Sequence, residues 1–395
     1  MNYQFSNKIN LLQPSVIREI LKFTSDPKVI PFAAGNPAPE AFPAKEIAEI
    51  TTDIFNVRPI EALQYSITEG YTPLRNTLKD YMKKEYNSFK DFDELIITAG
   101  AQQVVELTSK ILANEGDTVI CESPTFIGSL NAFRSYNLNI AGIDMDDDGI
   151  NLEKLENALK TQKNVRFIYV IPNFQNPSGI TMSKEKRINI YKLAQKYNVM
   201  ILEDNPYGEI RFDDEQICTI KSLDTDGRVI YAGSFSKILS PGMRVGFAIA
   251  PKEVCSKLIV AKQVSDVHTN ILAQLIAEQF MNKYDFAGHL AENRIIYKKK
   301  FDLMTSMLDR RLPASITYIK PKGGIFIWCT LPKSVNMLDF CKKAVEERVA
   351  VVPGSAFLTD ESLPCHNFRI NFSTPRDDQL AEGVEILGNV AKQFI

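Results

Sequence analysis

One loop of the sequence places a lysine among side chains that can bind a phosphate group. Ser234, Ser236 and Lys237 follow the apolar run 228–232, and Arg244 comes seven residues after the lysine. A lysine amine condenses with an aldehyde, and hydroxyl and guanidinium groups hold a phosphate. The spacing indicates a site for a phosphorylated aldehyde, although this loop alone would also fit a surface turn with an incidental lysine.

Other polar residues stand at the ends of further apolar runs. Asn176 follows one such run, and Asp204 and Tyr207 follow the next. Arg369 lies inside a later apolar segment. Ligands bind beyond the carboxyl ends of the strands in open α/β sheets. We therefore expect these residues to meet Lys237 in one site.

From about position 15 to 373, these motifs together resemble the fold-type-I enzymes that use pyridoxal 5′-phosphate. They are most similar to class I/II aminotransferases, and among those to the 2-aminoadipate and kynurenine aminotransferase branch. The resemblance implies transfer of the amino group of an L-amino acid to a 2-oxo acid such as 2-oxoglutarate. The expected amino donors are 2-aminoadipate, aromatic amino acids and large aliphatic amino acids.

The resemblance also implies roles for the residues at the strand ends. Lys237 would carry the cofactor covalently and then move the proton of the substrate α-carbon, which requires a lowered pKa. Asp204 would pair with the ring nitrogen of the cofactor, and Tyr207 and Asn176 would hydrogen-bond its phenolic oxygen. Arg369 would bind the substrate α-carboxylate, because its planar fork suits a bidentate pair.

The phosphate of the cofactor needs several donors. The resemblance and the free N–H groups of an expected helix start indicate the set Gly100, Ala101, Gln102, Ser234, Ser236 and Arg244. Many relatives have serine where this chain has Ala101, so one hydroxyl donor is missing here. Tyr65 matches a tyrosine that relatives lend to the phosphate of the partner subunit, which implies a homodimer with shared active sites.

Further residues are expected around the substrate. Phe126 matches the aromatic residue that stacks on the cofactor ring, and Phe326 and Phe357 would form apolar pocket walls. Gly35 matches a loop whose backbone lies beside the substrate. Arg18 matches an arginine on the covering N-terminal helix that reaches the substrate side chain in the aminoadipate branch, but a solvated helix arginine fits equally well.

Two other functions remain open at this point. A lyase that cleaves the β C–S bond of cysteine-like substrates would use the same Lys237, Asp204 and Arg369. A regulatory protein that senses pyridoxal phosphate without catalysis is a second alternative, because this aminotransferase branch also occurs fused to a DNA-binding domain. The matched region begins near Ser15, so we do not expect such a domain in front of it.

Composition limits the expected partners. The 395 residues carry a net charge of -2 with a sequence pI of about 6.1, which gives no electrostatic reason to expect nucleic acid or a membrane surface as partner. The six cysteines show no Cys-x-x-Cys pair and the three histidines no metal-ligand spacing, so we expect no metal. We see no signal peptide and no apolar run of ~20 residues, and expect a cytoplasmic protein.

The alternation of short apolar runs with helical patterns predicts an α/β fold. Strands are expected at 94–98, 118–122, 166–171, 199–203, 228–232 and 245–250, with helices at 102–113 and 184–197, the second capped by Ser183. We expect a mostly parallel sheet covered by helices, with seven strands by resemblance. Strands at 315–319, 323–328 and 368–372 predict a smaller α+β domain built from both termini. The expected division is an N-terminal segment 1–44, a large cofactor-binding domain 45–285 and a small domain 286–395.

Overall fold

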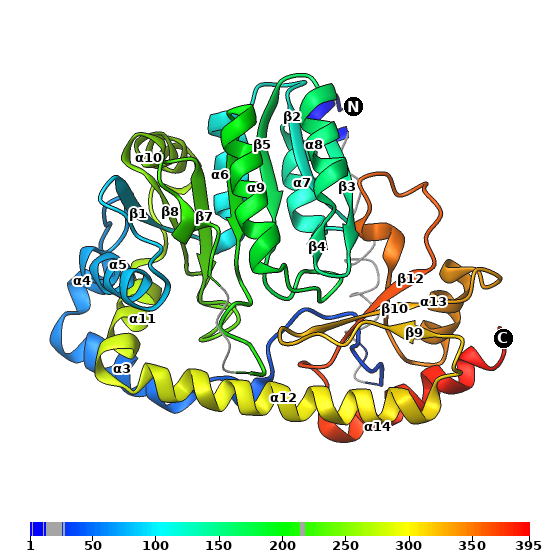
Figure 1. Cartoon of the computed structure of the whole chain (residues 1–395). Coiled ribbons are helices and arrows are strands. Elements are labelled where there is room, and N and C mark those ends of the chain that lie inside the picture. The colour runs from blue at the N-terminus through cyan, green and yellow to red at the C-terminus, as the bar shows by residue number, and fades with distance from the viewer. Residues whose placement is uncertain (2, 11, 13–25, 27, 214–217) are drawn as a thin grey trace.

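The computed structural model describes residues 1, 3–10, 12, 26, 28–213 and 218–395. A large twisted sheet carries helices on both faces, and a smaller sheet lies beside it (Figure 1). The long helix α12 (Phe286–Arg311) runs beneath both sheets (Figure 1). The structure is therefore the two-sheet α/β architecture that the sequence predicted.

The large sheet is mostly parallel. Its strands are β1 (Asp93–Thr98), β2 (Thr118–Ser123), β3 (Asn139–Asp146), β4 (Gly149–Ile150), β5 (Val165–Val170), β6 (Met200–Asp204), β7 (Val229–Ser234) and β8 (Gly246–Pro251). Their order across the sheet is β1-β8-β7-β6-β5-β2-β3-β4, and only β8 and β4 pair antiparallel with their neighbours. All six strands expected from the residues are confirmed, each within two residues of its expected ends.

The expected number of seven strands was wrong by one, because β4 adds an eighth. A strand of two residues is too short to produce an alternating pattern in the sequence. The run-based prediction also missed β3, since most side chains of this outer strand are exposed or half-buried and the strand therefore lacks a continuous apolar run.

Helices cover both faces of the large sheet. The helices of the described chain up to α11 are α1 (Asn7–Asn10), α3 (Ala44–Val57), α4 (Pro59–Leu63), α5 (Thr72–Tyr86), α6 (Ala101–Leu112), α7 (Ile127–Ser135), α8 (Leu152–Thr161), α9 (Lys184–Tyr197), α10 (Lys252–Asp266) and α11 (Ile271–Lys283), with 3-10 turns η1 (Pro39–Ala41) and η2 (Lys221–Leu223). Apolar residues of α6, α7 and α10 share one core with the sheet, and those of α8 and α9 share another. The Ser183 hydroxyl accepts a hydrogen bond from the backbone N–H of Lys186, as its predicted cap role requires.

The small sheet has the order β11-β12-β10-β9. Its elements are β9 (Thr317–Tyr318), β10 (Phe326–Thr330), β11 (Val352–Pro353) and β12 (Asn367–Asn371), with helices α13 (Met337–Glu346) and α14 (Asp377–Ala391) and the 3-10 turn η3 (Gly354–Phe357). Ile30 and Phe32 from near the N-terminus lie in the same core. The expected strand 323–328 begins only at Phe326, because Gly324 has a φ of 74° that extended strands do not allow.

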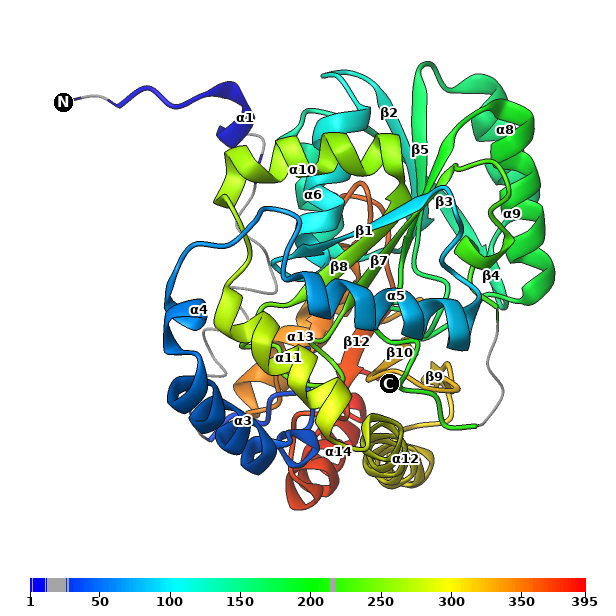
Figure 2. The same ribbon diagram turned by 90° about the vertical axis from the view of Figure 1, so that its left-hand side faces the viewer.

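One side of the molecule exposes many apolar side chains. Figure 2 shows α3, α4 and α10 along this side. The exposed residues there are Phe55, Val57, Ile60, Leu63, Tyr65, Ile67, Val260, Val264 and Val267. Among the described residues, no helix combines the length and the apolar character needed to cross a membrane.

Candidate active site

A cavity of about 450 Å³ lies where β5, β6 and β7 end and the two sheets meet. It is lined by Gly35, Asn36, Ala101, Gln102, Phe126, Ile127, Gly128, Asn131, Ile171, Asn176, Asp204, Pro206, Tyr207, Ser234, Ser236, Lys237, Pro241, Arg244, Phe326 and Arg369. Most of the expected site residues are in this lining. The chain thus brings them together from segments more than 300 residues apart, such as Gly35 and Arg369.

Lys237 lies in the loop that follows β7, and its side chain is enclosed by the cavity. Its Nζ donates a hydrogen bond of 2.6 Å to the backbone oxygen of Gly35. Burial, together with the nearby guanidinium groups of Arg369 and Arg244, lowers the pKa of Lys237 to about 8. A fraction of this amine is therefore neutral near neutral pH, as a nucleophile or proton acceptor must be.

Asp204 is the last residue of β6 and is buried at the cavity wall. Its Oδ2 accepts a hydrogen bond of 2.8 Å from the hydroxyl of Tyr169. Its Oδ1 is buried and has no hydrogen-bond partner among the described residues. Burial raises the pKa of Asp204 to about 6, and the bond from Tyr169 opposes this rise. The free Oδ1 marks a place where a cationic N–H of a ligand would be stabilised.

The sequence analysis did not identify Tyr169 as a site residue. It is the last residue but one of β5, in the apolar run 167–170, and its hydroxyl also accepts a hydrogen bond of 2.8 Å from Ser129. A buried tyrosine needs a partner for its hydroxyl. A tyrosine in this apolar run was therefore a usable signal, but the sequence could not identify Asp204 as its partner.

Arg369 lies on β12 at the wall that the small sheet contributes. Its Nη1 donates to Asn176 Oδ1 at 2.7 Å and its Nη2 to the backbone oxygen of Ala33 at 2.9 Å. The guanidinium carbon lies 4.0 Å from the ring centre of Phe326 and 4.9 Å from that of Phe357. Burial lowers the pKa of Arg369 to about 9, and its Nε has no partner among the described residues.

Tyr207 completes this side of the cavity. It is buried, which raises the pKa of its hydroxyl, while the positive charge of Arg369 acts in the opposite direction. Its ring meets that of Phe326 edge to face, with centroids 5.9 Å apart. The hydroxyl is therefore protonated at neutral pH and able to donate a hydrogen bond into the cavity.

The expected phosphate donors gather at the start of α6. Gly100 precedes the helix with a φ of 82°, and a side chain there would collide with the guanidinium of Arg244. Arg244 donates to the Ser236 hydroxyl at 3.4 Å and to the backbone oxygen of Ala99 at 3.1 Å. No carboxylate of the described residues forms an ion pair with Arg244. A helix start, two serines and an arginine without a counter-charge are suited to an anion.

Three expected residues are not in this lining. Gly100 lies directly behind it, against Arg244. Tyr65 is 80% exposed on the apolar side of the molecule, with its ring edge to face with His268 at 5.8 Å. Arg18 lies outside the described residues. In addition, the expectation that Phe357 forms a pocket wall was wrong, because this ring is fully buried behind Arg369.

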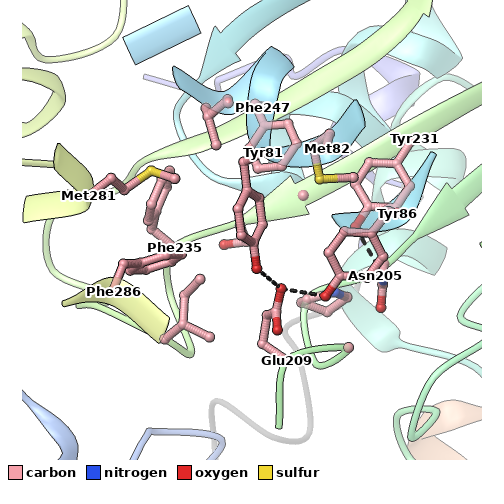
Figure 3. Close-up of a pocket in the computed structure, with 16 residues that line it drawn as sticks. Tyr81, Met82, Tyr86, Asn205, Glu209, Tyr231, Phe235, Phe247, Met281 and Phe286 are labelled. Carbon is pink, nitrogen blue, oxygen red and sulfur yellow. Dashed lines mark hydrogen bonds between the residues drawn. The ribbon is translucent and has the colours of Figure 1, made fainter. Parts of the chain in front are cut away.

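A second cavity, of about 30 Å³, lies behind the lysine loop and is shown in Figure 3. Glu209 at its edge accepts hydrogen bonds from the hydroxyls of Tyr81 and Tyr86 (Figure 3) and from Arg294 Nη2 at 3.0 Å. This volume has room for no more than about one or two water molecules. The cavity is therefore no substrate site, and the bonds to Glu209 hold the segment that carries Tyr207.

The side chains of the large cavity fit pyridoxal 5′-phosphate. The donors at the start of α6 match a phosphate, and the unpaired Oδ1 of Asp204 matches a protonated ring nitrogen. Phe126 offers a ring for stacking, and Lys237 offers an amine with a lowered pKa. One molecule with a phosphate, a protonated ring nitrogen, an aromatic ring and an aldehyde would meet all four of these features.

Comparisons with known proteins agree with this fit. The family model described as aminotransferase class I and II matches residues 27–387. The chain is 38% identical to aromatic-amino-acid aminotransferase 1 of Thermococcus litoralis, covering 98% of this chain and 94% of that protein. It is 36% identical to the 2-aminoadipate transaminase of Thermus thermophilus, covering 99% and 97%.

A solved structure shows the same fold with a cofactor derivative bound. The α-aminoadipate aminotransferase of Thermus thermophilus, complexed with N-(5′-phosphopyridoxyl)-L-leucine, superimposes with a TM-score of 0.91 at 35% identity, covering 99% of this chain and 97% of that one. The family match over most of the sequence, the fold and the unpaired carboxylate oxygen of Asp204 lead to one conclusion. The chain belongs to the class I and II aminotransferases, and its cofactor is pyridoxal 5′-phosphate.

Proposed function

We propose that this aminotransferase takes the amino group from 2-aminoadipate, aromatic amino acids and large aliphatic amino acids, and passes it to a 2-oxo acid such as 2-oxoglutarate. The observation that carries the proposal is the amine of Lys237, enclosed in the cavity beside Arg369 and with a pKa lowered to about 8. Relatives named for aromatic and 2-aminoadipate substrates support the donor range. Phe126 and Phe326 in the cavity wall favour large apolar side chains, because burial of apolar area contributes ~25 cal/mol per Å².

Lys237 has two roles in this proposal. Bound pyridoxal phosphate supplies the aldehyde that takes the amino group and the ring that withdraws electrons from the substrate α-carbon. Lys237 holds the cofactor covalently between turnovers. Once freed by the incoming amino acid, its Nζ accepts the proton of the substrate α-carbon, which a partly neutral amine can do near neutral pH.

The remaining residues orient the two ligands. Arg369 binds the substrate carboxylate while its guanidinium lies against the rings of Phe326 and Phe357, and Asn176 fixes the orientation of that guanidinium. Asp204 would hold the ring nitrogen of the cofactor in its protonated form, and Tyr207 would donate to its phenolic oxygen. The backbone of Gly35 lies beside the substrate. Its oxygen accepts a hydrogen bond from the amine of Lys237.

Lys237 provides the test of this function. Reduction of the holoenzyme with borohydride, followed by peptide mass spectrometry, is expected to find the pyridoxyl group on Lys237; a label on another lysine, or on none, would overturn the assignment. Amino donors are then screened with 2-oxoglutarate. Ammonia and pyruvate released from cystathionine, without transfer to the 2-oxo acid, would identify a β C–S lyase instead.

Arg18 is proposed to bind the acidic side chain of 2-aminoadipate. The proposal rests on its match to the covering helix of the aminoadipate branch. Arg18→Ala should lower kcat/KM for 2-aminoadipate by about 1.5–3 kcal/mol, the range for a charge-assisted hydrogen bond, and leave leucine unaffected. Equal effects on both donors would remove Arg18 from the substrate site.

We also propose a homodimer in which Tyr65 reaches the phosphate site of the partner subunit. The exposed large apolar residues of α3, α4 and α10 support this, since exposed apolar surface is typical of an interface. Mixing inactive Lys237→Ala with inactive Tyr65→Ala under subunit exchange should restore activity at one site of each hybrid. If activity is not recovered although subunit exchange is confirmed, the active sites are not shared.

We also propose that the chain divides into an N-terminal segment 1–44, a large domain 45–285 and a small domain 286–395.

A further inference from the structure

One buried face of α12 is polar, which is unusual for a helix that lies beneath both sheets (Figure 1). His289, Asn293 and Tyr297 are spaced four residues apart and therefore share this face. Asn293 is 3% exposed and Tyr297 is fully buried. Buried polar groups need partners, and the partners of these three belong to two segments of the active site.

The first segment is the loop of Lys237. His289 Nε2 lies 2.6 Å from the backbone oxygen of Ile238, the residue that directly follows Lys237. A carbonyl oxygen can only accept, so Nε2 carries the hydrogen and donates it. Asn293 Nδ2 donates to the same oxygen at 3.3 Å. Two side chains of α12 therefore hold the carbonyl next to the lysine.

The second segment runs from Gly35 to Ala38. The hydroxyl of Tyr297 accepts a hydrogen bond of 3.3 Å from the backbone N–H of Ala38. The other end of this segment meets the lysine directly, since Lys237 Nζ donates to the Gly35 oxygen. The two segments that meet at the lysine amine are therefore also joined through α12.

We propose that His289, Asn293 and Tyr297 are positioning residues that hold the Lys237 loop and the Gly35–Ala38 segment in register, and thereby set the place of the lysine amine. This inference rests on the proposed role of Lys237. The far half of α12 carries Phe301, Met304 and Leu308 in the core of the small sheet. The helix thus links the position of the small sheet to the position of the lysine.

The test compares His289→Leu, which removes the donor, with His289→Gln, which keeps an N–H at a similar reach. The first readout is the visible absorbance of the holoenzyme without substrate, titrated with pH, because it reports the environment of the lysine that carries the cofactor. We expect His289→Leu to shift this titration and to lower kcat by about 5–30-fold with little change in KM, and the Gln variant to recover most of both. Lys298→Ala, on an exposed part of the same helix and paired with Asp302, is the control that changes neither.

Asn293→Ala and Tyr297→Phe test the same face should His289→Leu fail to fold, and both are expected to shift the titration in the same direction with smaller losses of kcat. Folded His289→Leu and Asn293→Ala variants with the wild-type titration and turnover would overturn the inference. So would a loss in His289→Leu that Gln does not recover, since ring volume would then matter and not the hydrogen bond. The proposed function fails separately, if borohydride places the pyridoxyl group of the wild-type enzyme away from Lys237.

Discussion

The two walls of the active-site cavity differ in how their charged groups are hydrogen-bonded. On the wall formed by the large sheet, Asp204 leaves Oδ1 without a partner and Arg244 has no counter-charge among the described residues. On the wall formed by the small sheet, both Nη atoms of Arg369 donate, to Asn176 and Ala33, and the guanidinium contacts two aromatic rings, while its Nε has no partner among the described residues. The large-sheet wall leaves a buried carboxylate oxygen free for a ligand, and the small-sheet wall holds its cation in one orientation with two hydrogen bonds.

This difference matches the two ligands of an aminotransferase. An unpaired buried polar group costs about 1–3 kcal/mol, and the large-sheet wall bears this cost until a permanently bound cofactor removes it. The small-sheet wall must instead release one substrate after another, so an arginine that is already oriented by the protein loses little when the carboxylate leaves. The predictions that follow test this division between a cofactor wall and a substrate wall, from the largest expected effect to the smallest.

Removal of the lysine should have the largest effect. Lys237→Ala is expected to bind the cofactor without a covalent link, because the other large-sheet donors remain, and to lose turnover by at least the roughly 10²–10⁴-fold that one acid-base group contributes. Absorbance measures cofactor content and a coupled assay measures kcat. Near wild-type turnover in this variant would contradict both roles of the lysine.

Removal of the arginine should affect the other wall only. Under the proposed role of Arg369, Arg369→Ala leaves the substrate carboxylate without its cation, and we expect kcat/KM to fall by an amount corresponding to about 2–5 kcal/mol, as for truncation of a buried charged pair. Cofactor affinity, measured by titration of the apoenzyme, should change little. Arg369→Lys keeps the charge without the planar fork and should recover only part of the loss. A loss of cofactor affinity as large as the loss of kcat/KM would contradict the assignment of one wall to the cofactor and the other to the substrate.

The sequence predicted the cofactor wall better than the substrate wall. Asp204, Asn176 and Lys237 each follow a parallel strand, so the sheet itself brings them together and local patterns suffice. The bond from Tyr169 to Asp204 and the ring of Phe357 behind Arg369 depend on packing between distant segments, which no local pattern encodes.

The polar face of α12 shows the same limit. Its residues read as ordinary members of an amphipathic helix, and only the fold shows that their partners are the backbone of Ile238 and Ala38. Similarly, β3 was missed because an outer strand needs no continuous apolar run. Sequence patterns therefore predicted which residues lie at the ends of buried strands, and tertiary packing decided the rest.

Glu122 on β2 shows that a buried oxygen without a hydrogen-bond partner does not by itself indicate a ligand site. Like Asp204 it is fully buried with one unpaired carboxylate oxygen, Oε1, but it is not part of the cavity lining. Its Oε2 accepts from the backbone N–H of Ile171 at 3.1 Å and from Gln175 Nε2 at 3.2 Å. Burial raises the pKa of Glu122 to about 8 from the usual 4.5, so the group is protonated at neutral pH and needs no cationic ligand.

Glu122→Gln should therefore change the pH dependence of stability. A carboxyl with a raised pKa in the folded state contributes stability that is full below pH 4.5 and is lost as the pH rises through about 8. Glutamine mimics the protonated form, so the fall in the free energy of unfolding between these limits should shrink by on the order of 5 kcal/mol. Denaturant melts of the holoenzyme at several pH values measure this, and an unchanged slope would contradict a protonated Glu122.

Glu203 on β6, two strands away from β2 in the same sheet, is the matched control. Both of its oxygens accept backbone hydrogen bonds, from Ile220 at 2.9 Å and Lys221 at 2.7 Å. Burial raises the pKa of Glu203 as well, so its replacement also changes the slope. Glu203→Gln would in addition turn an amide N–H₂ toward one of these donors, so we expect a loss of stability at every pH value that Glu122→Gln does not show. An unpaired buried oxygen thus indicates a ligand only where it faces a cavity.

The smallest expected effect tests how the cofactor wall keeps Asp204 ionised. Tyr169 donates to Asp204 Oδ2 at 2.8 Å and opposes the rise of its pKa, which burial places at about 6. Tyr169→Phe removes this donor from the anion, so the pKa of Asp204 should rise further and less of the group should be ionised near pH 7. We expect the acid limb of the kcat/KM profile to move to higher pH by on the order of one unit. At high pH, where Asp204 is ionised in both proteins, turnover should approach the wild-type value. Tyr231→Phe is the control. It removes a buried hydroxyl on β7, the strand next to β6, and this hydroxyl accepts a hydrogen bond of 3.0 Å from Asn205 and forms none with Asp204. We expect this variant to leave the acid limb of the profile unchanged. A shift of the same size in both variants would mean that lost packing in the sheet, and not the hydrogen bond to Asp204, changes the profile.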